Sequence, residues 1–583
     1  MKNMKKFLAM MLALVMALGM TVTASAEVRT EPAENTADDR GTISIKGVDA
    51  AVPADGIKLY PILTAGYDET SGNFTGYEAV AAAEATLNKY QKNYADKQNE
   101  GLAADAENRT PETYVDALKA GKAVQIDVNI INELAGLTLN EATGYSVSKS
   151  EGTENVTIGD KTVTTAAYTC TNVPVGMYLV SIPGTETIIY NHAIASIYYT
   201  QDSEMANELL IMNSEIAAKA TLAPGIEKDV KVAAGDKGMG QSASVGDIIT
   251  YQVTVDPVPN YSGSNPVLNV VDKLSGTLEL QNGITVKAVD DNGTETPLVE
   301  NTHFTKSTAV EDGKTVLTVN FVINDQYKLA EYAGKKVVIE YGAKLLAAAE
   351  GNEKDNGNEA TLNYTRDSKV SEEEGKPETP PTDKTHTYTF NIGGNVTGLG
   401  VKDILQKVGE GADADGLPGA KFTIYTEDPT GKENPSVYNT NPNHVNGIVE
   451  SQADGKMVIK GLKAGIGEGN GIIYYLKETE APDNYTLNSH VFEIYVEATC
   501  KEDGTLDTWT IKIDGANTNT FSVENELVTQ TETSAPVQIQ NTTMSVLPST
   551  GGIGTTIFTI GGCAIMIVAA GLFFASRRKS SVK

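Results

Sequence analysis

The sequence predicts a mostly β protein built from β-sandwich domains in tandem, the first of which carries helical insertions. Short runs rich in β-branched and aromatic residues recur along the chain and are separated by Gly, Asn, Asp and Pro, which is typical of antiparallel sandwiches. Two breaks in composition, at 220–225 and at 371–385, divide the 583 residues into three folded parts.

The first part is predicted to begin with a strand at Gly41–Lys46, to contain an Ala-rich helix around Glu78–Asp96, and to return to a strand at Ala193–Tyr199. The second and third parts are dominated by strands. Their clearest strand patterns are Ile248–Val255, Val316–Ile323, Lys336–Tyr341, Lys421–Tyr425 and Val491–Val496.

Both ends of the chain are predicted to be targeting segments. Lysines near the N-terminus precede an apolar stretch and the small residues before Ala26, which is the order of a secretory signal peptide cleaved after Ala26. At the other end an apolar run over 552–575 is long enough to span a bilayer, and the basic residues after it stay cytoplasmic. Directly before this run stands a pentapeptide, Leu547, Pro548, Ser549, Thr550 and Gly551.

The order of pentapeptide, apolar run and basic tail resembles the cell-wall sorting signal of sortase substrates in Gram-positive bacteria. The resemblance implies that sortase, a transpeptidase, cuts between Thr550 and Gly551 and passes the threonyl group to an amine. We therefore expect a secreted protein, held briefly by a single membrane span and then anchored covalently to the cell wall.

These segments predict the domain organisation of the whole chain. We expect a signal peptide at 1–26, an N-terminal β domain with helical insertions at 27–222, a β-sandwich at 223–370, a linker at 371–386, another β-sandwich at 387–546 and the sorting segment at 547–583.

Charge and composition argue against several functions. The net charge is −30, and removing the seven basic residues of the two end segments leaves about −37, which disfavours nucleic acid as a partner. The five histidines show no metal-ligand spacing and no nucleophile motif accompanies them, so we expect no metal, no cofactor and no enzyme. Three cysteines in different segments predict no disulfide framework, so an extracellular chain of this length needs another reinforcement.

The third part contains Leu405–Val408, Leu417–Tyr425 (LPGAKFTIY), Tyr475–Pro482 (YLKETEAP) and the closing run Val537–Asn541. This set resembles a collagen-adhesin B-type domain, which has an Ig-like fold. Alternation along these strands turns one lysine, one acid and one amide into the core, where polar groups are costly unless they meet. These three residues are Lys407, Glu478 and Asn541.

In that family the lysine amine attacks the asparagine carboxamide and expels ammonia, which leaves an amide (isopeptide) crosslink. The resemblance therefore implies a bond from Lys407 to Asn541, with Glu478 as the promoting acid. Desolvation favours the neutral amine and the neutral carboxylic acid, and contact between the reactants lowers the barrier. Asn525, which also ends an alternating strand, is the alternative partner for Lys407.

The second part resembles the related A-type domain, through Pro224–Val230, Val245–Tyr251 and Asn358–Tyr364. Alternation selects Lys228, Asp272 and Asn358 as inward residues, while Lys231 lies on the opposite face. The resemblance implies an amide from Lys228 to Asn358 with Asp272 as the acid, although Asp272 also fits a turn residue that caps its strand. The first part shows no comparable set.

Together the signal peptide, the sandwiches and the sorting segment resemble a fimbrial (pilin) subunit. The partners this implies are sortase, other pilin subunits and a peptidoglycan precursor. Shaft pilins of the family carry a Tyr-Pro-Lys whose lysine receives the next subunit, but the only Tyr-Pro here is Tyr60-Pro61, followed by Ile62, which leaves Lys219 near the domain boundary as a candidate. The alternative is a wall-anchored adhesin that does not polymerise and binds a host or bacterial surface ligand.

Overall fold

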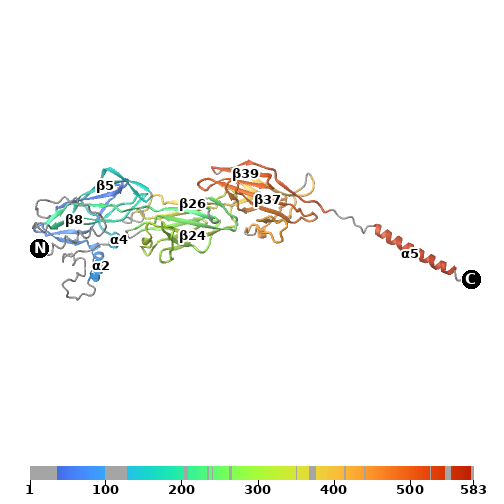
Figure 1. Ribbon diagram of the computed structural model, residues 1–583, viewed down its shortest axis with the longest axis horizontal. Coiled ribbons are helices and arrows are strands. Elements are labelled where there is room, and N and C mark those ends of the chain that lie inside the picture. Colours follow the sequence, from blue (N-terminus) through green and yellow to red (C-terminus); the bar gives the residue numbers. More distant parts are fainter. Residues whose placement is uncertain are drawn as a thin grey trace.

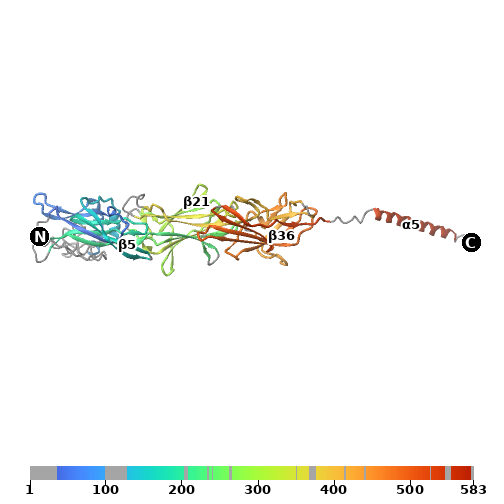
Figure 2. The same ribbon diagram turned by 90° about the horizontal axis from the view of Figure 1, so that it is seen from above.

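The computed structural model describes residues 36–98, 128–159, 161–201, 208–232, 236–238, 240–261, 266–349, 351–366, 376–411, 415–438, 441–525, 527–544 and 553–579. Three β-rich lobes follow one another along a rod, and helix α5 (Ile553–Lys579) lies beyond the third lobe (Figures 1 and 2). The mostly β architecture predicted from the sequence is confirmed. Ala26 and the pentapeptide from Leu547 to Gly551 lie outside the described residues.

The first domain combines two main sheets with two helices. One sheet has the order β10-β1-β5-β4 and the other β3-β2-β6-β8-β9, while β11 pairs with β7. Strand β6 lies in the middle of its sheet and is buried along its whole length, and the helices contribute Leu87 and Leu134 to the same core. The elements are β1 (Arg40–Asp49), η1 (Ala54–Gly56), β2 (Lys58–Tyr67), β3 (Phe74–Ala79), α2 (Ala81–Gln98), α4 (Val128–Gly136), β4 (Ser146–Ile158), β5 (Lys161–Pro174), β6 (Gly176–Ser181), β7 (Ile188–Tyr190), β8 (Ala193–Gln201), β9 (Glu208–Ile211), β10 (Asn213–Ala217) and β11 (Ala220–Leu222).

The second domain is a sandwich of two sheets. The first sheet runs β13-β12-β15-β24-β18-β19, with β17 also paired to β24, and the second runs β14-β26-β25-β16-β21-β20. The elements are β12 (Gly225–Val232), β13 (Asp236–Gly238), β14 (Gly240–Ser242), β15 (Ile248–Asp256), β16 (Leu268–Leu274), β17 (Leu278–Leu280), β18 (Thr285–Val289), β19 (Glu295–Pro297), β20 (Thr305–Glu311), β21 (Lys314–Asn320), β22 (Val322–Ile323), β23 (Gln326–Tyr327), η2 (Ala330–Tyr332), β24 (Lys336–Leu345), β25 (Asn358–Tyr364) and β26 (Thr382–Tyr388).

The third domain packs a large sheet against smaller ones. The large sheet has the order β32-β31-β36-β37-β38-β39-β40, and the sheet β33-β30-β41 brings the closing strand β41 parallel to β30. The elements are β27 (Phe390–Ile392), β28 (Gly394–Val396), β29 (Gly400–Lys402), β30 (Leu405–Val408), β31 (Lys421–Tyr425), η3 (Val445–Gly447), β32 (Ile448–Glu450), β33 (Lys456–Met457), β34 (Ile459–Leu462), β35 (Gly465–Ile466), β36 (Ile472–Glu480), β37 (Val491–Cys500), β38 (Leu506–Ile513), β39 (Asn517–Glu524), β40 (Leu527–Glu532) and β41 (Val537–Gln540).

Both composition breaks contain strands. Residues 220–222 form β11 of the first domain, so the connection to β12 is only Ala223 and Pro224. The predicted linker at 371–386 ends in β26, which pairs with β25 and β14. Its last residues therefore belong to the second sandwich, because an unpaired sheet edge accepts a strand whatever its composition.

Hydrogen bonds from backbone amides to a carbonyl and to two side-chain hydroxyls join the second and third domains. The amide of Val245 donates to the carbonyl of Gly461 at 3.0 Å, and the amide of Ala464 donates to Oγ of Ser242 at 2.8 Å. The amide of Leu506 donates to the hydroxyl of Tyr388, at the end of β26, at 3.0 Å. The two sandwiches therefore contact each other at several points, and they follow one another along the rod in Figure 2.

Helix α5 corresponds to the predicted apolar run. Its segment Thr556–Arg577 has a mean hydropathy of 2.3 and is by length and composition able to cross a membrane.

Candidate crosslink sites

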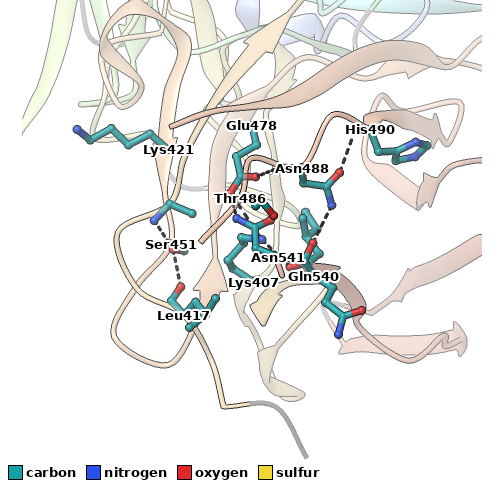
Figure 3. Close-up of polar contacts among 12 residues, drawn as sticks. Lys407, Leu417, Lys421, Ser451, Glu478, Thr486, Asn488, His490, Gln540 and Asn541 are labelled. Atoms are coloured by element: carbon teal, nitrogen blue, oxygen red, sulfur yellow. Dashed lines mark hydrogen bonds and ion pairs between the residues drawn. The ribbon is translucent and has the colours of Figure 1, made fainter. Parts of the chain in front are cut away.

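In the third domain the structure brings together the three polar residues predicted to face the core. Lys407 lies on β30, Glu478 lies on β36 of the opposing large sheet, and Asn541 directly follows β41. All three are at most 2% exposed. Figure 3 shows their side chains converging between the two sheets.

The contacts within this group are short. The amine of Lys407 lies 3.6 Å from Oε1 of Glu478 and donates to the carbonyl of Ile539 at 2.9 Å. Nδ2 of Asn541 donates to the same Oε1 at 2.9 Å, while its Oδ1 has no partner. The acid therefore touches both the amine and the carboxamide that would react.

Asn525 lies elsewhere. It is exposed and has a φ of 49° in the turn between β39 and β40. The side chain beside Lys407 and Glu478 is that of Asn541.

The second domain holds a similar group between its two sheets. Lys228 on β12 comes from one sheet, and Asp272 on β16 and Asn358 on β25 come from the other. Their exposed fractions are 0%, 1% and 1%. Lys228 donates to Oδ2 of Asp272 at 2.6 Å, which makes a buried ion pair and gives Asp272 a place in the core rather than in a turn.

A fourth residue, Tyr341 on β24, occupies the centre of this group. Its hydroxyl accepts hydrogen bonds from Lys228 Nζ at 2.9 Å and from Asn358 Nδ2 at 2.8 Å, and it donates to Oδ2 of Asp272. The ring stacks on Tyr251 with centroids 5.6 Å apart, and the Lys228 amine lies 5.3 Å from the Tyr251 ring centroid. Tyr341 thus contacts every polar member of the group.

Burial sets the electrostatics of both sites. Burial lowers the pKa of the Lys228 amine because a charged amine loses its hydration inside the sandwich. The negative charge of Asp272 opposes this shift. The pKa of Lys407 is lowered for the same reason, with Glu478 opposing the shift. A lowered pKa increases the fraction of neutral amine, which is the nucleophilic form.

Sequence reasoning missed two residues of these sites. Tyr341 faces inward by simple alternation along β24, but only the order β12-β15-β24 of the folded sheet brings its hydroxyl to Lys228. Asn488 lies in a loop. Its backbone amide donates to Oε2 of Glu478 at 2.6 Å, and its side-chain Nδ2 donates to the carbonyl of Gln540 at 3.0 Å (Figure 3). It thereby orients the acid and holds the closing strand, and no sequence pattern marks it.

The first domain offers no similar group among the residues that the structure describes. Lys46 on β1 is 60% exposed and forms an ion pair with Glu215 at 2.8 Å. Within the same described residues, no cluster of three or more His, Cys, Asp or Glu side chains has the arrangement of a metal site.

Comparisons with known proteins match two parts of the chain to families. Residues 404–512 match a family described as a prealbumin-like fold domain, SpaA, and residues 539–581 match the LPXTG cell wall anchor motif. The sorting motif and the wall location predicted from the sequence are thereby confirmed: the chain is a cell-wall-anchored surface protein.

Individual relatives are Gram-positive surface proteins. The trypsin-resistant surface T6 protein of Streptococcus pyogenes serotype M6 is 25% identical over 483 residues, which are 71% of this chain and 81% of the relative. Among solved structures, the T6 backbone pilin of the same serotype has 17% identity and a TM-score of 0.45, with 88% of this chain and 100% of that chain covered. The major pilin SpaA of Corynebacterium diphtheriae has 14% identity and a TM-score of 0.39, with 86% and 100% covered.

Proposed function

We propose that this chain is a pilin subunit, which sortase assembles covalently and anchors to the cell wall, and which two internal Lys–Asn amides reinforce. The wall anchor and the relationship to the T6 surface protein support the pilin assignment. The observation that supports the reinforcement is the burial of two lysines, each in contact with an acid. In the third domain the acid also contacts the asparagine carboxamide. In the second domain it contacts the tyrosine hydroxyl to which the carboxamide is hydrogen-bonded.

Each crosslink forms without an external reactant. The lysine gives a proton to the acid, and the neutral amine attacks Cγ of the asparagine. The acid passes this proton to Nδ2 and takes up a second proton that the former lysine nitrogen loses. The bond between Cγ and Nδ2 then breaks as the new Cγ–Nζ amide bond is completed, and the released ammonia takes the second proton from the acid and leaves as ammonium. One amide replaces another, so no oxidant or energy source is needed, and the acid returns to its starting state.

The intact mass tests the crosslinks. The folded chain is expected to weigh less than its sequence by one ammonia for each amide, and peptide mapping is expected to recover Lys407 joined to Asn541 and Lys228 joined to Asn358. An unmodified mass would refute the reinforcement while leaving the wall anchor untouched.

For polymerisation we propose Lys219 as the lysine that receives the next subunit. It is exposed, and it lies between β10 and β11 where the first domain meets the second. With the cognate sortase, the chain is expected to form a ladder of covalent oligomers in denaturing gels, and Lys219→Arg is expected to abolish that ladder.

Lys46→Arg, at another exposed lysine of the first domain, is the matched control and should leave the ladder intact. If the Lys219→Arg variant still forms the ladder, another lysine is the acceptor. If the unsubstituted chain gives only a wall-linked monomer, the protein is the non-polymerising adhesin instead.

A further inference from the structure

The two candidate crosslink sites differ in how the acid reaches the carboxamide. In the third domain Oε1 of Glu478 accepts directly from Nδ2 of Asn541 at 2.9 Å. In the second domain the acid is Asp272, whose side chain is one methylene shorter, and Asn358 Nδ2 donates to the hydroxyl of Tyr341 at 2.8 Å instead. That hydroxyl in turn donates to Asp272. The tyrosine therefore occupies the gap that the shorter acid leaves.

Burial keeps this hydroxyl in its neutral form. Tyr341 is 2% exposed, and burial followed by the charge of Asp272 raises the pKa of its hydroxyl well above the ordinary value. A neutral hydroxyl that both accepts and donates hydrogen bonds can pass a proton along without becoming an anion. The polar groups that face it are Lys228 from β12, Asp272 from β16 and Asn358 from β25, with the ring of Tyr251 from β15 beside it.

We propose that Tyr341 is a catalytic residue of the second domain, which relays a proton from Asp272 to the leaving nitrogen of Asn358. This inference rests on the proposed Lys228–Asn358 amide and adds a residue to its mechanism.

Lys228 first gives a proton to Asp272, and its neutral amine forms a bond to Cγ of Asn358. Asp272 then donates its proton to the Tyr341 oxygen while the Tyr341 hydroxyl gives its own proton to Nδ2, so the tyrosine is unchanged. Asp272 takes up the proton that the former lysine nitrogen loses, the Cγ–Nδ2 bond breaks, and ammonia leaves, taking that proton as ammonium.

A single substitution tests the relay in the full chain. Tyr341→Phe removes the hydroxyl and keeps the ring that stacks on Tyr251. The chain is sampled at intervals during cell-free synthesis, and the joined Lys228–Asn358 and Lys407–Asn541 peptides are quantified by mass spectrometry. We expect the second-domain amide to form about 100-fold or more slowly, which is the lower range for loss of a general acid–base group.

Two references accompany this measurement. The third-domain amide in the same molecules should form at the normal rate, which reports that the chain has been made and folded. Tyr251→Phe is the matched control, since the Tyr251 ring lies in the same core but its hydroxyl pairs with Thr387 at 3.4 Å and not with the reacting groups. It should leave both rates unchanged.

The results distinguish failure of the Lys228–Asn358 crosslink from failure of the Tyr341 relay. If the unsubstituted chain never forms the Lys228–Asn358 amide, the proposed crosslink fails, and the relay fails with it. If that amide forms normally but Tyr341→Phe forms it equally fast, only the relay is overturned.

A second variant covers the case in which Tyr341→Phe disturbs folding. A fluorinated tyrosine at position 341 keeps the hydroxyl and nearly the same size but is a stronger acid. A relay predicts a changed rate and a displaced pH profile for the second-domain amide, whereas an unchanged profile contradicts it.

Discussion

At the scale of single residues, a lysine that is 0% exposed needs a reason to be in the core. Lys228 and Lys407 each lose their hydration, and a contacting carboxylate together with one further hydrogen bond reduces the cost. Converting the amine into an amide removes the charge for good. The same desolvation that makes these lysines unfavourable in an unreacted core also makes them nucleophilic.

The acid on β36 gives the first prediction at this scale. Glu478→Gln keeps the size and a hydrogen bond but cannot take up the lysine proton. Relative to the mass of its own sequence, we expect the variant to lack one ammonia rather than two. Peptide mapping should assign the retained ammonia to the third domain, while the second-domain amide still forms.

Glu480→Gln is the matched control on the same strand, because Glu480 is exposed and pairs with Lys421. It should leave the mass loss unaltered. A third-domain amide that forms normally in Glu478→Gln would remove Glu478 from the mechanism.

At the scale of elements, the closing strand β41 is short and is held by parallel pairing with β30 alone in its sheet. The Lys407–Asn541 amide would fasten this strand to β30, so that a pull on the wall-linked end is transmitted through a covalent bond. Asn488 supports the same strand through the carbonyl of Gln540.

We therefore expect Asn541→Ala to destabilise the third domain. A crosslink that closes a loop of about 100 residues or more contributes on the order of 5 kcal/mol, which corresponds to a melting temperature lower by roughly 10–20 °C for a domain of this size. Differential scanning calorimetry measures the change. Asn525→Gly, in the exposed turn after β39, is the control, because Gly adopts the positive φ of this position without strain. It should melt like the unsubstituted chain, and the reverse result would assign the bond to Asn525.

At the scale of the whole molecule, the junction between the second and third domains contains a partly buried network around Asp355. Its carboxylate contacts Nδ1 of His386 at 2.9 Å and Nζ of Lys384 at 2.8 Å, both on β26. Nearby, Oδ1 of Asn352 accepts the amide of Asn391, on β27 in the third domain, at 3.0 Å. Burial would raise the pKa of Asp355, but the hydrogen bonds from His386 and Lys384 hold it below the ordinary value.

This network predicts a pH dependence. A carboxyl whose pKa is lower in the folded than in the unfolded chain stabilises the fold above the unfolded value of 3.8, and that contribution is lost as pH falls through the folded pKa. Asp355→Asn should lower the melting temperature by a few degrees at pH 7, and this difference should shrink below about pH 4.

The control for this prediction is Asp291→Asn, at an exposed position between β18 and β19. Calorimetry from pH 7 to pH 2 should show no comparable difference for it. If the difference in melting temperature between Asp355→Asn and the unsubstituted chain stays constant over this pH range, the pH dependence does not come from the Asp355 carboxylate.

Much of the fold and of both sites was predictable from local patterns. The period of two in strands placed Lys228, Asp272 and Asn358 on inward faces, and likewise Lys407, Glu478 and Asn541. The linker prediction at 371–386 was wrong at its end, because β26 is defined by the sheet edge that it joins and not by its composition.

By itself, the sequence determined the C-terminal sorting segment, the strand-rich domains and the faces of their strands, since these depend on residues that are neighbours in the chain. Only the tertiary structure decided that Asn541 rather than Asn525 lies beside Lys407, and that Tyr341 stands between Asp272 and Asn358. Such contacts join residues far apart in the sequence, so they depend on how whole sheets pair and stack, which no local pattern contains.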